Sequence, residues 1–161
     1  MWEVERSIVI KAPPLRVWTA LADFDGFKRW HPFIRLAGAG VEGAKLDYTF
    51  FTSWTRKPLT APATLTRFRK PETIGWLAGL RGILLIEEVY EIGVVSAGTE
   101  VRHRMLWRGL LGRMPLVNTR PRLLSFMKES DAALERHLRH ATTAVRPLSR
   151  HDRRAAKRKA R

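Results

Sequence analysis

The stretch "IVIKAPPLRVWTALADFDGFKRWHPFI", residues 8–34, holds the end of a strand, a turn and two short helices in immediate succession. The strand covers residues 2–10, where apolar and polar side chains alternate. Pro14 suits the first turn of the next helix, because the first N–H groups of a helix have no partner within it. An Asp-Gly pair then interrupts this helix, and Pro32 stops a second helical piece over 27–30. The stretch therefore predicts a strand followed by two short helices.

Most of the chain after this stretch reads as strands separated by short turns. Apolar and polar residues alternate in these runs, which is the pattern of a sheet with one buried face. Connections this short predict antiparallel neighbours, because a parallel pair needs a crossover of a dozen residues or more. The expected strands are 46–54, 61–69, 73–80, 83–92 and 99–108.

The last expected element is a long amphipathic helix that begins at Thr119, its N-cap, and ends near Thr142. A single helix of this kind must bury its apolar stripe on the one large apolar surface available, the concave side of the sheet. The predicted class is therefore α+β. The residues of the stripe are Leu123, Leu124, Met127, Leu134, Leu138 and Ala141.

The composition indicates one soluble domain and excludes several kinds of site. A chain of 161 residues with 45% hydrophobic content can bury a single core of ordinary size. The absence of cysteine excludes disulfides, thiolate metal sites, iron–sulfur clusters and a cysteine nucleophile. The longest aliphatic run, residues 83–86, is too short to span a bilayer, and the N-terminus does not resemble a signal peptide. We expect a cytoplasmic protein with no cofactor and no metal.

The densest part of the formal net charge of +15 lies at the C-terminus, and residues 1–145 remain basic. Residues 146–161 carry eight basic residues and one acid, and they contain no large apolar residue after Leu148. Such a segment buries too little surface to offset its ordering entropy, so we expect a disordered basic tail after a folded domain of residues 1–145. This tail is either a solubilising polycation or a contact for an anionic surface, such as a membrane or nucleic acid.

The order of elements and several short motifs resemble the START-like (SRPBCC) superfamily, which includes polyketide cyclase/dehydrase-type and birch-allergen-like proteins. The resemblance covers roughly residues 3–142. It implies a helix-grip fold, in which a curved antiparallel sheet of about six or seven strands wraps around the C-terminal helix, with an apolar cavity between them for a lipophilic ligand. The matching pieces are the opening stretch, "GAKLDYTF" (43–50), "ETIGWLAG" (72–79), "EEVYEI" (87–92), "GTEVRHRMLWRGLLG" (98–112) and the closing helix.

The resemblance also implies which residues contact the ligand. Residues on the apolar side of each strand and of the helix would line the cavity or the core beneath it. Trp30 and Phe33 would lie near the mouth, where they either gate it or fill a gap. Val17, Trp18 and Leu21 are expected in the core. The candidate ligand-binding residues are Trp30, Phe33, Tyr48, Phe50, Trp76, Tyr90, His103, Met105, Leu124, Met127 and Leu134.

Three ionisable residues share parity with the apolar face of their strands: Arg6, Glu88 and His103. An unpaired charge in an apolar interior is costly, so these residues should find partners. One interpretation is a buried Arg6–Glu88–His103 cluster. The other is that one or two of them reach solvent at a strand end and that His103 is a hydrogen-bonded core histidine.

Three functions are compatible with these patterns. The first is the binding of a hydrophobic small molecule or lipid between sheet and helix. The second is a polyketide cyclase or dehydratase-type enzyme, with His103 and Glu88 as acid and base and Arg6 orienting an oxyanion. The third is a basic module that holds a membrane or RNA through the tail and an outer strand face carrying Arg102, Arg104 and Arg108.

Overall fold

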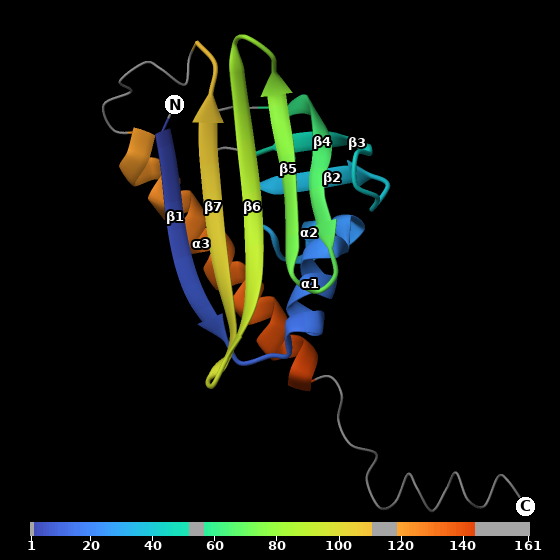
Figure 1. The fold of residues 1–161 in the computed structure, drawn as a ribbon, viewed down its shortest axis with the longest axis vertical. Helices are drawn as coiled ribbons and strands as arrows, with labels where there is room; N and C mark the ends of the chain where they lie inside the picture. Colours follow the sequence, from blue (N-terminus) through green and yellow to red (C-terminus); the bar gives the residue numbers. More distant parts are fainter. Residues whose placement is uncertain (1, 52–56, 111–118, 144–161) are drawn as a thin grey trace, which may run out of the picture.

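The computed structural model describes residues 2–51, 57–110 and 119–143 (Figure 1). The predicted tail and the end of the predicted strand 46–54 lie outside these ranges. The elements in chain order are β1 (Trp2–Ile10), α1 (Pro14–Ala22), η1 (Phe24–Gly26), α2 (Phe27–Trp30), β2 (Ile34–Gly38), β3 (Lys45–Phe50), β4 (Leu59–Arg69), β5 (Thr73–Leu80), β6 (Leu84–Val95), β7 (Gly98–Arg108) and α3 (Thr119–Thr143).

The seven strands form one antiparallel sheet in the order β1-β7-β6-β5-β4-β3-β2. Figure 1 shows α3 lying across one face of this sheet, and β2 and β3 turned away from the direction of the other strands. Both short helices follow β1. The predicted α+β helix-grip fold is confirmed. In the described residues, no helix has the length and apolar character needed to cross a membrane.

The structure adds β2, a strand that the sequence patterns did not predict. It is only five residues long, and its alternation is limited to Ile34 and Leu36, which are buried, and Arg35, which is not. So short a run is hard to distinguish from a loop. Its pairing with β3 supplies the hydrogen bonds that make it a strand.

The first short helix packs against the sheet as its spacing predicts. Pro14 occupies its first turn, and Val17, Trp18 and Leu21 are buried. It ends at Asp23, whose side chain accepts a hydrogen bond from Gly26 N at 3.0 Å. This carboxylate caps η1 and turns the chain into α2.

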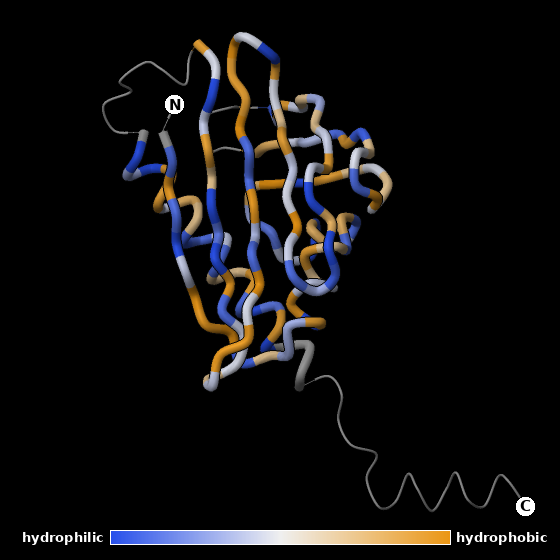
Figure 2. The backbone as a smooth tube through the Cα atoms, viewed as in Figure 1, coloured by the Kyte–Doolittle hydropathy of each residue, from blue (hydrophilic) through white to orange (hydrophobic). Residues whose placement is uncertain are grey.

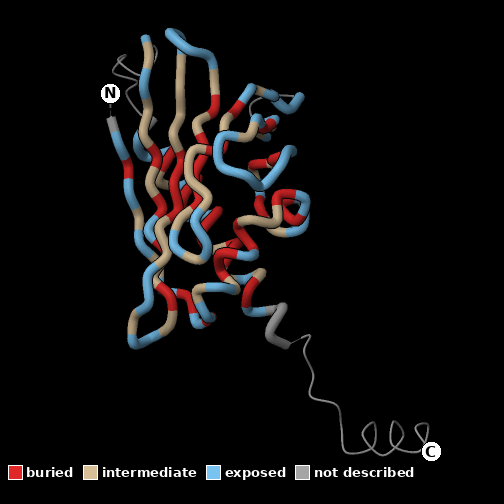
Figure 3. Tube along the Cα trace, turned by 45° about the vertical axis from the view of Figure 1, so that its right-hand side comes forward, coloured by how far each residue is buried: buried red, intermediate tan, exposed pale blue. Residues whose placement is uncertain are grey.

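The core lies between the concave face of the sheet and α3. Residues directly opposite each other on neighbouring strands share a face, so Ile74, Tyr90, His103 and Arg6 form one row across β5, β6, β7 and β1. Figure 2 shows apolar segments along these strands, and Figure 3 shows the buried segments in their middle with exposed segments at their ends. In this row the polar groups of Tyr90 and His103 are therefore enclosed, whereas Arg6 is half-buried.

The opposite, outer face of the sheet is covered by ion pairs. Arg102 lies 3.5 Å from Glu5 and 3.8 Å from Glu91. Arg104 and Arg108 are likewise paired with glutamates: Arg104 with Glu3 (3.5 Å) and Glu91 (3.4 Å), and Arg108 with Glu87 (2.9 Å). Because these arginines already face carboxylates, the outer face offers phosphates less positive charge than its sequence suggests.

Candidate functional site

A fully buried histidine connects the sheet to α3. His103 Nε2 lies 3.0 Å from Glu88 Oε1 on the neighbouring strand β6, and His103 Nδ1 lies 2.9 Å from Asp131 Oδ1 on α3. Neither His103 nor Glu88 has any exposed surface, and Asp131 is 2% exposed. Because each ring nitrogen faces a carboxylate oxygen, each nitrogen carries a proton and the ring is an imidazolium.

Glu88 also accepts hydrogen bonds from two aromatic side chains. Trp76 Nε1 on β5 donates to Oε2 at 3.1 Å, and Tyr90 Oη donates to Oε1 at 3.0 Å. The ring of Tyr90 stacks on that of His103, with centroids 4.1 Å apart. Donors from three adjacent strands therefore hold one buried carboxylate, which satisfies the requirement that a buried charge be paired and hydrogen-bonded.

The fourth ionic member is Arg6 of β1. Its Nε lies 3.3 Å from Asp131 Oδ2, and its side chain is 30% exposed. The predicted cluster of Arg6, Glu88 and His103 thus exists in modified form, because Arg6 joins it through Asp131 and not through Glu88. We call these four residues the ionic cluster. It contains two cations and two anions, so its net charge is zero.

Asp131 is the residue that the sequence interpretation missed. Its position follows Met127 by four residues and precedes Leu134 by three, which places it on the apolar stripe of α3. An acid in the middle of such a stripe corresponds to the ionisable residues on the apolar faces of the strands. The same reasoning, applied with the helical period of 3.6 residues, would have found it.

The pKa of His103 follows from this environment. Burial lowers it, but the hydrogen bonds to Asp131 and Glu88 and the negative charges of both outweigh burial and raise the pKa to about 9. The pKa of Tyr90 is raised well above its usual value by burial and by the charge of Glu88. His103 is therefore charged and Tyr90 neutral at physiological pH.

A second buried histidine, His31, has the opposite character. Its Nδ1 accepts hydrogen bonds from Phe33 N at 3.2 Å and Ile34 N at 3.1 Å, so the proton of the neutral ring is on Nε2. Among the described residues, Nε2 has no hydrogen-bond partner. Burial, followed by the positive charges of His103 and Arg35, lowers the pKa of His31 to about 3. The ring stacks on Phe27 with centroids 5.4 Å apart.

His31→Asn will reduce the loss of stability in acid. The folded-state pKa of about 3 lies below the unfolded value of 6.5, so His31 contributes stability above pH 6.5 that is lost as pH falls towards 3. This corresponds to about 3 kcal/mol between pH 7 and pH 4. The asparagine oxygen can accept the same two backbone N–H groups but does not titrate. Urea unfolding at several pH values measures the effect, and identical acid slopes in both proteins would contradict it.

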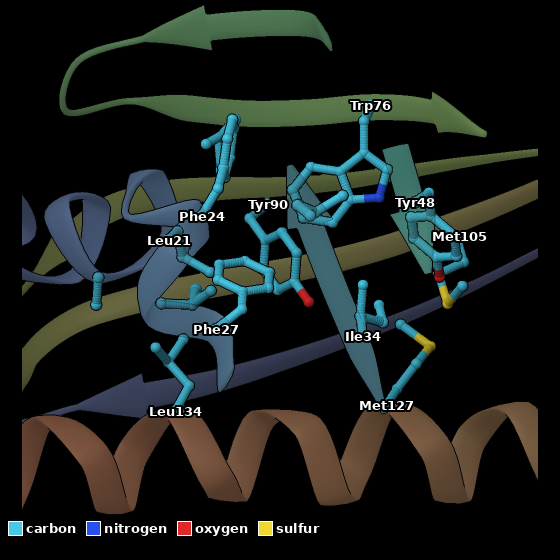
Figure 4. Close-up of a cluster of buried hydrophobic side chains, with 14 of the residues drawn as sticks. Leu21, Phe24, Phe27, Ile34, Tyr48, Trp76, Tyr90, Met105, Met127 and Leu134 are labelled. Atoms are coloured by element: carbon cyan, nitrogen blue, oxygen red, sulfur yellow. The ribbon is translucent and has the colours of Figure 1, made fainter. Parts of the chain in front are cut away.

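The structure brings the predicted ligand-binding residues together between sheet and helix. Figure 4 shows Met127 and Leu134 of α3 pointing towards the residues of the sheet. Trp76, Met127 and His103 have no exposed surface, so neighbouring side chains cover them completely. Trp30, Phe33, Phe50 and Leu124 are half-buried, whereas Tyr48, Tyr90, Met105 and Leu134 are buried.

This packing limits where the implied cavity can lie. At the level of Trp76 and Met127, side chains fill the space between sheet and α3. Nearer the β5–β6 turn, the residues of β6 and β7 that face inwards are less buried. Leu84, Ile86 and Trp107 are half-exposed there. We call these three the mouth residues.

A separate groove of about 430 Å³ lies between α1 and the second half of α3. None of the predicted ligand-binding residues lines it. Its lining residues are Pro13, Leu15, Arg16, Thr19, Ala20, Asp23, His137 and Leu138.

The chemistry available to the ionic cluster is restricted. An imidazolium whose two N–H groups both bind carboxylates has no free nitrogen with which to accept a proton. Its surroundings also keep it from a substrate, because neither it nor Glu88 has exposed surface. The cluster instead ties α3 to β1, β6 and β7.

Comparison with known proteins gives the same fold. Protein NE0264 from Nitrosomonas europaea matches with a TM-score of 0.68 and 13% identity, over 88% of this chain and 96% of that chain. Ara h 8.0201 matches with a TM-score of 0.66 and 14% identity, over 85% and 97%. The di-domain ARO/CYC StfQ from the steffimycin biosynthetic pathway matches with a TM-score of 0.65 and 12% identity, over 84% and 48%. At these identities the likeness concerns the fold.

Sequence comparison assigns the family. No curated protein matches the sequence. The family model described as "Polyketide cyclase / dehydrase and lipid transport" matches residues 1–139, which include every strand and most of α3. The chain therefore belongs to the polyketide cyclase/dehydrase and lipid transport family, within the SRPBCC proteins that its motifs resemble.

Proposed function

We propose that this protein binds a hydrophobic small molecule or lipid between the sheet and α3, entering past the mouth residues. Family membership implies a hydrophobic ligand in general terms. The observation that carries the proposal is the change in exposure along β6, where Glu88 is fully buried and Ile86 and Leu84, on the same face, are half-exposed. An apolar face that is incompletely covered is a typical place for a hydrophobic ligand to bind.

The aromatic side chains near α2 and α3 provide a second apolar wall. Phe33 and Phe50 both pack on Phe126, with ring centroids 4.9 Å and 5.7 Å apart. Phe33 and Phe50 are half-buried. Rings in this position can shift to admit a flat or aliphatic ligand at little cost, because few polar groups need new partners. In this proposal the residues predicted from the sequence line the bound ligand or support the side chains that do.

The enzyme alternative has less support. It requires His103 and Glu88 to exchange protons with a substrate, yet their contacts are already complete and neither has exposed surface. The similarity to StfQ concerns the fold and does not bring that protein's chemistry to this chain. Binding without turnover is therefore the function that the geometry favours.

Leu84→Arg will weaken the binding of an apolar probe at least tenfold, because it places a charge at the mouth. The matched control is Leu85→Arg, since Leu85 is the next residue of β6, is also half-exposed and faces the outer side. Titration with N-phenyl-1-naphthylamine, an uncharged apolar fluorophore, measures both affinities. We expect the control to stay within twofold of the wild type. Equal affinities for the two variants would contradict binding through the mouth.

A further inference from the structure

One end of the sheet carries a group of exposed aliphatic side chains. Leu80 at the end of β5, Ile83 in the β5–β6 turn and Leu110 just after β7 are 54%, 52% and 69% exposed. We call residues 80–83 and 108–110 the tip. Figure 1 shows the β5–β6 turn and the end of β7 at the same end of the sheet, and Figure 2 shows apolar segments there.

Backbone contacts hold the two parts of the tip together. Leu110 N donates to Gly82 O at 3.1 Å, and Ile83 N donates to Leu80 O at 3.2 Å. Gly109 has a φ of +97°, and a Cβ on it would lie 2.7 Å from Ile83 O. Only glycine fits this close approach without strain. The exposed side chains of Ile83 and Leu110 therefore stand on adjoining, hydrogen-bonded backbone.

The tip is positively charged. It contains Arg81 and Arg108 and no acidic residue. Arg108 is paired with Glu87 at 2.9 Å. Arg81 is exposed, and no carboxylate of the described residues lies within ion-pair distance of it. Arg81 thus differs from Arg108 and the other arginines of the outer face, which face glutamates.

We propose that the tip docks on an anionic lipid surface, with Ile83 and Leu110 entering the interfacial layer and Arg81 contacting lipid phosphates. Exposed aliphatic side chains, beside a cation that has no ion pair among the described residues, match the apolar and anionic layers of such a surface. RNA would match the cation alone and would leave the aliphatic groups in water. A second copy of this chain would bring its own Arg81 to the contact, and both copies carry a formal net charge of +15. This inference goes beyond ligand binding, because it names the surface that the protein meets.

The test compares two double variants of the full chain. Ile83→Ser/Leu110→Ser removes tip side chains, and Val41→Ser/Val94→Ser removes valines that are 62% and 80% exposed elsewhere. Leu80 is kept because it is the strand partner of the mouth residue Leu84. Sedimentation with phosphatidylglycerol/phosphatidylcholine vesicles measures partitioning, and circular dichroism checks folding. We expect the tip variant to lose tenfold or more in partitioning and the control to stay within twofold of the wild type.

A single variant tests the charge. Arg81→Gln should lower partitioning to the phosphatidylglycerol vesicles about fivefold and leave partitioning to pure phosphatidylcholine unchanged, because one cation near an anionic surface contributes about 1 kcal/mol. Wild-type protein that does not bind these vesicles, or a tip variant that binds like the wild type, would overturn the proposal. So would a wild-type dimer that the tip substitutions convert to monomer while vesicle binding is unchanged.

The same preparations separate this proposal from ligand binding. The native mass of each variant reports whether an apolar adduct is present. Lost vesicle binding with the adduct retained supports the tip as a docking surface. Retained vesicle binding in Ile83→Ser/Leu110→Ser overturns docking whether or not the adduct is present, whereas a missing adduct in the wild type counts against the proposed function alone.

Discussion

Asp131→Asn will lower the free energy of unfolding by about 3–5 kcal/mol, the usual cost of removing one partner from a buried ion pair. The substitution keeps the shape of the side chain but removes the negative charge that faces both His103 Nδ1 and Arg6 Nε. The remaining cluster then holds two cations and one anion in the interior. Urea unfolding at pH 7, followed by circular dichroism, measures the change.

The matched control for this substitution is Glu129→Gln. Glu129 lies two residues earlier on α3, is exposed and accepts a hydrogen bond from Ser125 Oγ at 3.1 Å. Its replacement should change the free energy of unfolding by less than about 0.5 kcal/mol, as is usual for surface positions. If Asp131→Asn were as mild as Glu129→Gln, the ionic cluster would not be what ties α3 to the sheet.

The second large effect is a loss of stability on the alkaline side. The folded-state pKa of His103, about 9, lies above the unfolded value of 6.5. The contribution of His103 to the free energy of unfolding is therefore complete below pH 6.5 and is lost as pH rises through about 9. The expected loss in the free energy of unfolding is about 3 kcal/mol between pH 6 and pH 9. Each pH unit between the two pKa values corresponds to about 1.4 kcal/mol.

His103→Gln supplies the comparison for this pH dependence, because glutamine does not titrate. The measured quantity is the slope of the free energy of unfolding against pH, so a lower stability of the variant at every pH does not affect the test. The groups around His103 are Glu88, Asp131 and Tyr90, with Arg6 beyond Asp131. Parallel curves for the two proteins between pH 6 and pH 9 would show that His103 is not a buried imidazolium.

Much of the fold could be predicted because its elements are long and periodic. The alternation in β5 and β7 and the stripe of α3 repeat often enough to determine type and orientation. By contrast, β2 has five residues and depends on its partner β3 for stability. Because β2 forms through its pairing with β3 in the folded protein, no pattern within its own residues predicts it.

Part of the candidate site could be predicted from the alternation of inward-facing and outward-facing side chains along the strands. Parity placed Arg6, Glu88 and His103 on the inner face, but it could not say that Arg6 and Glu88 bind different partners, since that depends on where α3 crosses the sheet. It also could not show that Trp76 fills the middle of the interface. The depth of packing depends on how side chains from several elements interdigitate, and a linear pattern does not contain that information.

The most direct test of the proposed function is the native mass spectrum of the full chain, purified without detergent. We predict a stoichiometric apolar adduct that disappears on denaturation and is identified by solvent extraction. The adduct should persist in Leu85→Arg and be lost in Leu84→Arg. A bare mass for the wild type, in preparations that also fail to take up added fatty acid or phospholipid, would contradict ligand binding between the sheet and α3.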